Sequence, residues 1–307
     1  MGMRFHCVYN CRFLSNSASY AALEDSFRLG ISTIHYIIKE VCEALHMPVP
    51  TTEMLLATSK EFYLKLNFPN CVGSFDGKHI WLKCPSHSGS MYYNYKHYYS
   101  IVPQGLADAR YRFIAIDVGT YGKQSDGEIF RHSSLYQFLS SNNLNMPNAR
   151  KLPLSDVELP FVILGAEAYP LLSYLMRPYP RRQLTESRRL FNYRQSRGRR
   201  VVESAFGILA GKWNILNKPI ETSPDMADRI VECICVLYNI VIDREGVDEA
   251  SLLELQNQED SFSTNLDEPE LQVTQSNNIS NLRKGTIRDA FTVYLNSDVC
   301  RHPENSQ

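Results

Sequence analysis

Apolar positions in the first sixty residues follow helical spacing. Ser32 is suited to cap a helix, and the apolar residues after it recur three or four positions apart on one face. These residues are Ile34, Ile37, Ile38, Val41 and Leu45. A shorter helix before them ends near Phe27, and a glycine-containing turn separates the two. The pattern predicts a small helical region over residues 1–60 that resembles part of a helix-turn-helix. Such helix pairs are more often plain scaffold than DNA readers.

From residue 66 onward the pattern changes to alternating strands and helices. The apolar stretches of strand length are CVGSFDGKHIWLK, YSIVPQGLADA, YRFIAIDVG and PFVILG. A long helix is expected after Ser196, and another after the Ser223–Pro224 pair, which is typical of a helix start. Consecutive strands followed by alternating strand and helix predict an α/β core over residues 66–243, a mixed sheet with helices on both faces.

The last sixty residues break this pattern. Residues 246–307 are rich in acidic residues and in Asn, Gln and Ser, which predicts a largely disordered tail. Within it, LRKGTIRDAFTVYLNS predicts one short helix. The 307 residues therefore divide into a helical region, one α/β core and a tail.

The overall composition narrows the class of protein without indicating an activity. A charged share of 21% and a net charge of −1 are typical of a soluble globular protein. No apolar run reaches the length of about 18 residues that a membrane helix requires, so no membrane partner is expected. The eight cysteines are scattered without a CxxC pair, which argues against a zinc site or a disulfide framework.

Basic residues are concentrated in one segment. RPYPRRQLTESRRLFNYRQSRGRR, residues 177–200, holds nine arginines and one acidic residue, with aromatic residues between them. Arginine offers bidentate contacts to phosphate, so the segment predicts a DNA-binding surface. The candidate contacts are Arg181, Arg182, Arg188, Arg189, Arg194, Arg197, Arg199 and Arg200. A solvated helix face is the alternative interpretation of the same pattern.

Two carboxylates are candidates for metal-binding or catalytic residues. Asp76 lies inside a predicted strand, where a buried carboxylate needs a partner such as a metal, although a turn at Asp76–Gly77 is the alternative. Glu203 follows Arg199 by one helical turn, and an ion pair between the two is the simpler interpretation. Further acidic candidates near strand ends or at a helix cap are Asp108, Asp117 and Asp126.

The stretch ILGAEAYPLL, residues 163–172, predicts a buried strand that ends at Gly165 and leads into a turn. The carboxyl end of a strand is where α/β sheets place their chemistry. Here that position holds Ala166, which has no functional group, beside Glu167.

Taken in order, these strings resemble the PIF/Harbinger transposases and the nucleases derived from them. The resemblance extends over roughly residues 13–243, and the strings that carry it are FPNCVGSFDGKHIWLKCP, SGSMYYNYKHYYSIVPQGLADARYRFIAIDVGTYGKQSDGEIF, ILGAEAYPLL and FNYRQSRGRRVVESAFGILAGKW. The resemblance implies an RNase H-like fold of the DDE superfamily. It also implies hydrolysis or transfer of DNA phosphodiesters by two divalent ions, Mg²⁺ or Mn²⁺, held by two aspartates and one glutamate. Gly198 and Tyr238 depart from the alanine and histidine usual in that family.

The resemblance assigns roles residue by residue. Asp76 matches the first family aspartate, and Glu203 matches the glutamate of an Arg-x-x-Glu-x-x-Phe-Gly helix. The second aspartate belongs in a Gly-Asp-x-x-Tyr string, in which Ala166 stands at its position here. Glu167 is the neighbouring carboxylate that could replace it, although consecutive residues of an extended chain point in opposite directions. Loss of one ligand implies metal-dependent hydrolysis weakened by several kcal/mol.

Three functions stay open at this point. The chain is a Harbinger transposase-derived nuclease with impaired hydrolysis, a catalytically inactive relative that binds DNA or protein, or a decayed transposon copy. An engineered aspartate-to-alanine change would give the same sequence. DNA is the expected partner, and the family resemblance implies a separate DNA-binding protein as a second one. A DNA substrate implies the nucleus, with the cytoplasm as a second location.

Overall fold

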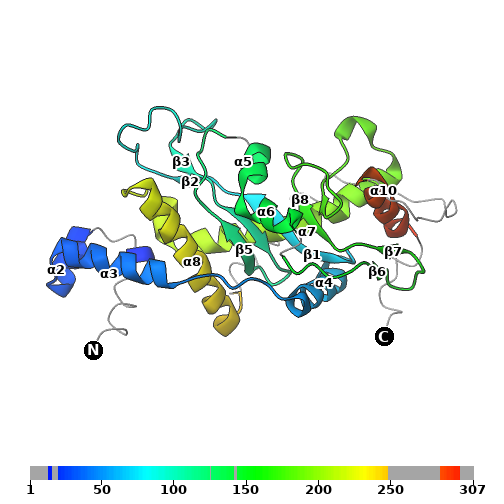
Figure 1. Ribbon diagram of the computed structural model, residues 1–307, viewed down its shortest axis with the longest axis horizontal. Coiled ribbons are helices and arrows are strands. Elements are labelled where there is room, and N and C mark those ends of the chain that lie inside the picture. Colours follow the sequence, from blue (N-terminus) through cyan, green and yellow to red (C-terminus); the bar gives the residue numbers. More distant parts are fainter. Residues whose placement is uncertain (1–12, 16–19, 125, 142–143, 248–283, 298–307) are drawn as a thin grey trace.

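A computed structural model describes residues 13–15, 20–124, 126–141, 144–247 and 284–297. Its centre is a five-stranded sheet with the order β5-β4-β1-β8-β9 (Figure 1). The bounds are β1 (Cys71–Gly77), β4 (Gln104–Ala107), β5 (Phe113–Asp117), β8 (Val162–Gly165) and β9 (Leu175–Met176). β1 pairs antiparallel with β4 and parallel with β8, so it lies in the middle of the sheet. The predicted mixed sheet of an RNase H-like α/β fold is confirmed.

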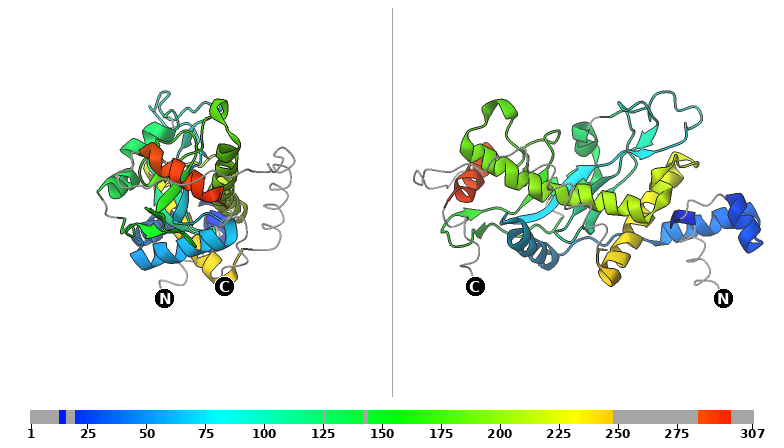
Figure 2. Two further views of the ribbon diagram at one scale, coloured as in Figure 1. Left: turned by 90° about the vertical axis from the view of Figure 1, so that its right-hand side faces the viewer. Right: turned by 180° about the vertical axis from the view of Figure 1, so that it is seen from behind.

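Helices cover both faces of this sheet. One face packs against α7 and α8, and the other packs against α5 and α6. Figure 2 shows the long α7 running along the sheet when the molecule is seen from behind. The bounds are α2 (Tyr20–Phe27), α3 (Ile31–Ala44), α4 (Thr52–Leu66), α5 (Asp126–His132), α6 (Ser134–Ser140), α7 (Glu186–Lys212), α8 (Pro224–Glu245) and α10 (Lys284–Leu295). Within the described ranges, no helix has the length and apolarity needed to cross a bilayer.

Smaller elements lie at the borders of the core. β2 (Ile80–Trp81) and β3 (Ser100–Ile101) form one two-stranded sheet, and β6 (Arg150–Lys151) and β7 (Glu158–Leu159) form another. The α2–α3 pair lies at one end of the molecule, where α3 packs on α8 (Figure 1). α10 confirms the predicted C-terminal helix, whereas the rest of the predicted disordered tail, residues 248–283 and 298–307, lies outside the described residues.

Side chains on opposite faces of β1 enter two separate apolar clusters. Phe75 lies in the cluster under α5 and α6, where its ring packs against Phe130 and Tyr169 at centroid distances of 5.2 and 4.9 Å. Successive residues of a strand point to opposite faces. Asp76, the next residue, therefore faces α7, the side on which its partner Arg199 lies.

A glycine allows α7 to lie close to the sheet. A β-carbon added at Gly198 would collide with the side chain of Leu164 on β8. Glycine inside a helix costs about 1 kcal/mol relative to alanine. The close approach of α7 to β8 therefore gives a physical reason for glycine at position 198, where the family usually has alanine.

Two helix starts differ from the prediction. α3 begins at Ile31 after Gly30, with no side-chain cap, rather than after Ser32. α7 begins at Glu186, well before Ser196, because the side-chain oxygen of Thr185 accepts a hydrogen bond from a backbone N–H of the first turn. The density of charge in this segment masked the helical spacing of its few apolar residues.

The predicted first strand is in fact two strands in two sheets. β1 ends at Gly77, and the backbone N–H of Lys78 donates to Pro103 O at 3.0 Å. β2 then pairs with β3 instead of continuing beside β4. The apolar residues after Asp76 therefore belong to a separate ribbon, which leaves Asp76 at the end of its strand.

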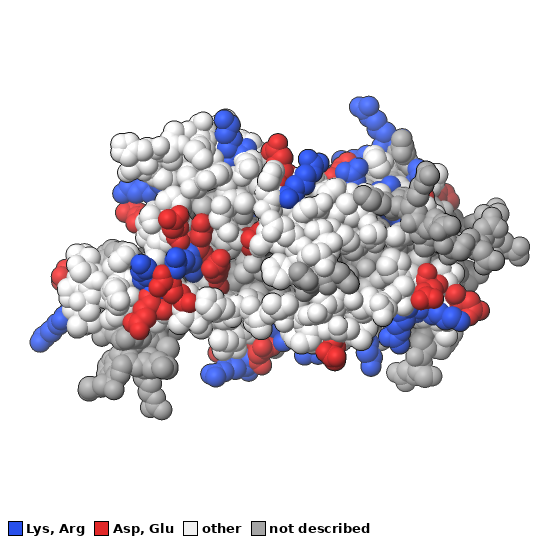
Figure 3. Space-filling model, in the orientation of Figure 1, with Lys and Arg blue, Asp and Glu red and all other residues white. Residues whose placement is uncertain are grey.

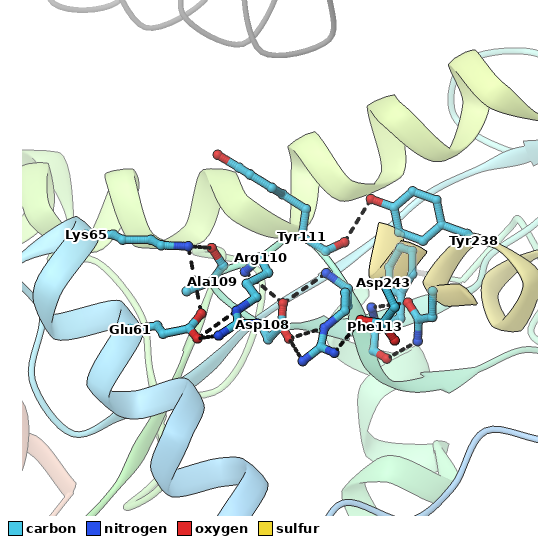
Figure 4. A network of polar contacts seen from close by, with 11 residues as sticks. Glu61, Lys65, Asp108, Ala109, Arg110, Tyr111, Phe113, Tyr238 and Asp243 are labelled. Atoms are coloured by element: carbon cyan, nitrogen blue, oxygen red, sulfur yellow. Dashed lines mark hydrogen bonds and ion pairs between the residues drawn. The ribbon is translucent and has the colours of Figure 1, made fainter. Parts of the chain in front are cut away.

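A charged network fixes the turn between β4 and β5 (Figure 4). Asp108 is only 3% exposed and accepts hydrogen bonds from the backbone N–H groups of Arg110 and Arg112. The Arg112 side chain lies 2.8 Å from Asp108 and 2.7 Å from Asp243 of α8. Arg110 pairs with Glu61 of α4, and this hydrogen bond lowers the pKa of Glu61. The network ties two helices to one turn.

Polar side chains of α8 extend this network along β5. Tyr238 donates a hydrogen bond through its hydroxyl to Tyr111 O at 2.9 Å. Asn239 accepts from the backbone N–H of Phe113 and donates to its carbonyl. Tyr238, the second departure from the family pattern, thus anchors the β4–β5 turn to α8 (Figure 4).

We predict that Asp108→Ala destabilises the fold by about 3 kcal/mol, because it leaves a partly buried arginine and two backbone donors without their acceptor. Asp243→Ala is the matched control: it removes the exposed partner of the same Arg112 and should cost less than about 1 kcal/mol. Urea unfolding at neutral pH measures both free energies. Equal costs would show that Asp108 does not hold the turn.

Candidate active site

Asp76 and Glu203 converge on one arginine. Asp76 lies near the end of β1, and Glu203 lies on α7 one turn after Arg199. The Arg199 Nη1 atom is 3.2 Å from Asp76 Oδ2 and also pairs with Glu203 Oε1. The ion pair predicted from helical spacing is therefore present, and the same guanidinium extends it to the strand.

The surroundings of this triad are partly desolvated. The exposed fractions of the side chains are 16% for Asp76, 23% for Arg199 and 43% for Glu203. Asp76 Oδ1 also accepts a hydrogen bond from the backbone N–H of Gly77 at 2.9 Å. Two carboxylates this close repel each other, and the repulsion grows as water is excluded. The Arg199 cation between them offsets this repulsion.

The end of β8 lies beside the end of β1. Phe75 is the register partner of Gly165, so Ala166 follows at the edge of the sheet where Asp76 lies. Gln195 of α7 fixes this end by donating to Gly165 O at 2.7 Å. The Ala166 side chain is half-buried and packs against the apolar cluster under α5 and α6. The backbone at residue 166 thus lies next to that of Asp76, but the Ala166 side chain packs with the cluster that holds Phe75 and offers no ligand.

Glu167 has a different environment. Its side chain is exposed, and its backbone carbonyl accepts a hydrogen bond from Arg177 Nη1 at 3.2 Å. The same arginine nitrogen donates to Tyr169 O at 3.3 Å, which fixes the turn after β8. The ion pairs described for Asp76 and Glu203 run through Arg199 and do not involve Glu167. Its role as a replacement ligand stays a prediction.

The other acidic candidates have structural partners or lie outside the described side chains. Asp117, at the end of β5, accepts hydrogen bonds from the backbone N–H and the hydroxyl of Ser134 at the start of α6, while burial raises its pKa. Asp108 belongs to the β4–β5 turn. Asp126 opens α5, and its side chain is outside the described residues.

The carboxylates present do not complete a two-metal site. Two close ions are normally held by several carboxylates and bridge the attacking and leaving oxygens. Among the described residues, no group of three or more His, Cys, Asp or Glu side chains could hold a metal ion. Asp76 and Glu203 share their oxygens with Arg199, and Ala166 adds none. The donor set is therefore too small for the two ions that the family resemblance implies.

The arginines of residues 177–200 fall into two groups. Arg181, Arg182 and Arg189 are exposed to solvent. Others are engaged within the molecule: Arg194 is buried, Arg199 is ion-paired, and Arg188 lies 4.7 Å from the ring centre of Tyr179. Arg197 lies 5.9 Å from the ring centre of Tyr193, and Arg200 is half-buried. The exposed group is the part of this segment best placed to meet a phosphate backbone.

Sequence reasoning missed an acidic group at the start of α8. Asp225, Asp228 and Glu232 follow one another at helical spacing, the signal that could have revealed it. Burial, followed by the charges of Glu232 and Asp225, raises the pKa of Asp228 to about 7. Asp228 Oδ1 is buried and has no hydrogen-bond partner among the described residues. Burial also raises the pKa of Glu232, and Asp117 adds to that effect.

Comparison with known proteins identifies a family for this chain. The sequence profile of the family described as DDE superfamily endonuclease matches residues 75–239, which run from the end of β1 into α8. A relative from Arabidopsis thaliana described as Protein ALP1-like is 28% identical over 246 residues. That match covers 76% of this chain and 59% of the relative, so the chain spans well under two thirds of the relative's length. No solved structure gives a significant match.

We predict that Asp228→Asn stabilises the protein at alkaline pH. Because the pKa of Asp228 is higher in the folded chain than its ordinary value of 3.8, its ionisation opposes folding. The gain should be about 1–3 kcal/mol at pH 8, shrink as the pH falls below about 7, and vanish below about 4. Urea unfolding as a function of pH measures it.

Glu245→Gln, at the other end of α8, is the control for this prediction because Glu245 is exposed. It should show no such pH-dependent gain. A gain from Asp228→Asn that is the same at pH 4 and pH 8 would contradict the explanation by ionisation.

Proposed function

The chain belongs to the DDE superfamily endonucleases, and from this membership we propose that it is a Harbinger transposase-derived nuclease that binds DNA while its phosphodiester hydrolysis is suppressed. The observation that supports this proposal is the triad at the end of β1, in which Arg199 joins Asp76 and Glu203 beside Ala166. A nuclease of this family uses divalent metals, and the present donor set is too small to hold two of them.

Suppression follows from the balance of charge at this site. Each divalent ion brings two positive charges, and Arg199 already neutralises one of the two negative charges of Asp76 and Glu203. An incoming ion must displace the guanidinium and still lacks the carboxylate that residue 166 would supply. We therefore expect a loss of several kcal/mol in stabilisation of the transition state, equal to at least about a hundredfold in rate.

A catalytically inactive DNA- or protein-binding module is the second candidate. The observation that favours it is the same guanidinium, because a site neutralised by its own arginine keeps its geometry without a metal. The two candidates differ in what one added carboxylate should do. Restoration of cleavage supports a nuclease that lacks one ligand, and its failure supports the binding module.

We predict that Ala166→Asp produces metal-dependent nicking of plasmid DNA, at least about tenfold above the unchanged protein in Mg²⁺ or Mn²⁺. The added carboxylate would join Asp76 and Glu203 and outweigh the single charge of Arg199. Because the Ala166 methyl packs against an apolar cluster, the change should also cost about 1 kcal/mol of stability. Gel assays of supercoiled plasmid and thermal unfolding measure the two effects.

Ala166→Asn is the matched control for this gain, because it has the same size without the charge and should add no cleavage. Asp76→Ala in the Ala166→Asp background should abolish the gain. Cleavage that is equally strong in the unchanged protein would mean that another carboxylate, such as Glu167, completes the site. Absence of cleavage in a folded Ala166→Asp protein would favour the binding module.

We further predict that binding to duplex DNA weakens with salt through the exposed arginines of α7 and the segment before it. The logarithm of affinity should fall with the logarithm of salt, and Arg189→Gln should flatten that slope by about 0.9 for one lost phosphate contact. Arg229→Gln is the control: Arg229 is an exposed arginine on α8, outside the basic segment. Equal effects of the two changes would contradict a localised DNA-binding surface.

A further inference from the structure

The segment after Asp76 has an unusual composition. Residues 77–107 contain no aspartate or glutamate, whereas they hold three lysines, three histidines, five tyrosines and Trp81. The acid-free segment begins at the end of β1, where the candidate site lies, and includes β2, β3 and the loop between them. Positive charge and aromatic rings are therefore concentrated next to the site without compensating acids inside the segment.

Several of these rings are exposed and lie against one another. Tyr95 is 75% exposed, and Trp81 is 46% exposed. His79 packs edge-on against Tyr95 at a centroid distance of 5.5 Å, and Trp81 packs against Tyr98 at 5.7 Å. We call His79, Trp81, Tyr93, Tyr95 and Tyr98 the aromatic surface. In Figure 3 the region of the β2–β3 loop is largely free of charged side chains, and both basic and acidic side chains lie at its border.

Buried polar contacts hold this surface in place. Asn94 is 3% exposed, and its side-chain oxygen accepts hydrogen bonds from the backbone N–H groups of Lys96 and Tyr98. Its amide nitrogen donates to Ser100 Oγ of β3 at 2.9 Å. Tyr95 thus stands on a turn that is fixed on both sides. A ligand that stacks on a fixed ring does not have to order that ring on binding.

Cations accompany the rings. Lys96 Nζ lies 5.5 Å from the centre of the Tyr95 ring, and Lys83, two residues after β2, is exposed and pairs with Glu221 at 3.2 Å. Burial and, to a smaller extent, the charge of Lys96 lower the pKa of Lys78. Fixed rings that alternate with cations are the features by which proteins bind single-stranded nucleic acid, through stacking on base faces and attraction to phosphates.

A protein partner fits these features less well. Protein-binding patches are contiguous apolar areas with few charges at their centre, whereas here lysine lies directly beside the most exposed ring. A DNA duplex also fits poorly, because its base faces are hidden inside the stack. Unpaired bases expose those faces, and only they can use the rings of the aromatic surface.

We propose that the aromatic surface binds unpaired bases of single-stranded DNA next to the candidate active site. The proposal rests on the proposed function, which makes DNA the ligand, and adds a site for its single-stranded form. His79 follows Asp76 by three residues, which is at most about 10 Å of extended chain. Bases stacked on this surface would therefore keep the adjoining phosphates near Asp76 and Arg199.

The test measures affinity in EDTA, so that cleavage plays no part, by polarisation of a labelled single-stranded oligonucleotide and of a blunt duplex. Tyr95→Ala should lower affinity for the single strand by about 5- to 100-fold and leave duplex affinity unchanged. Tyr95→Phe keeps the ring and should retain binding. Tyr36→Ala removes a tyrosine of α3 that is 69% exposed, and it should change neither affinity.

Tryptophan fluorescence gives a second readout. The chain has two tryptophans, and Trp213 is only 6% exposed within the core. A base stacked on Trp81 should quench its emission when the single strand is added. Trp81→Phe should remove the quenching and keep most of the affinity, whereas quenching that survives in Trp81→Phe would contradict the stacking.

The outcomes separate this proposal from the proposed function. If Tyr95→Ala leaves single-strand affinity unchanged while Arg189→Gln weakens duplex binding, the aromatic surface is overturned and the proposed function remains. Equal losses for single strand and duplex also overturn a site for unpaired bases. Loss of a co-purifying protein in Tyr95→Ala, with unchanged DNA affinity, would identify a protein interface instead. Failure to bind either form of DNA overturns both proposals.

Discussion

Two carboxylates cannot share a partly desolvated space without a cation, and the site is organised around this constraint. Asp76 comes from a strand and Glu203 from a helix, and Arg199 lies between them. The arginine belongs to the same helix as Glu203, so α7 supplies both an acid and its counter-ion. The contact between α7 and β1 therefore has an electrostatic component in addition to its apolar packing.

The position of β1 between β4 and β8 brings these groups together. The parallel register of Phe75 with Gly165 places Ala166 beside Asp76, and Gly198 lets α7 lie close enough for Arg199 to reach the strand end. On the far side, the Asp108 network fixes the turn between β4 and β5 to α4 and α8. The contacts of Gly165, Gly198 and Arg199 join segments distant in sequence and set the geometry of the sheet edge at Asp76.

The sequence predicted the mixed sheet and its flanking helices, because period-2 and helical apolar patterns survive without tertiary information. It also predicted the Arg199–Glu203 pair, since helical spacing alone brings those side chains together. It did not predict that Asp76 would join them, because that contact spans 123 residues. The early start of α7 and the split after Gly77 were missed because a charged helix and a short ribbon carry weak local patterns.

The charge balance also relates Arg199 to Ala166. A third carboxylate at residue 166 would leave three negative charges against one guanidinium, an arrangement that needs further cations. With alanine there, two negative charges meet one positive charge, and partial exposure of Glu203 lets water screen the remainder. The arrangement thus keeps one net negative charge without a metal, instead of the two it would have with a third carboxylate. Alanine at residue 166 therefore takes away one metal ligand. It also takes away the additional negative charge that would favour a metal ion over Arg199 at this site.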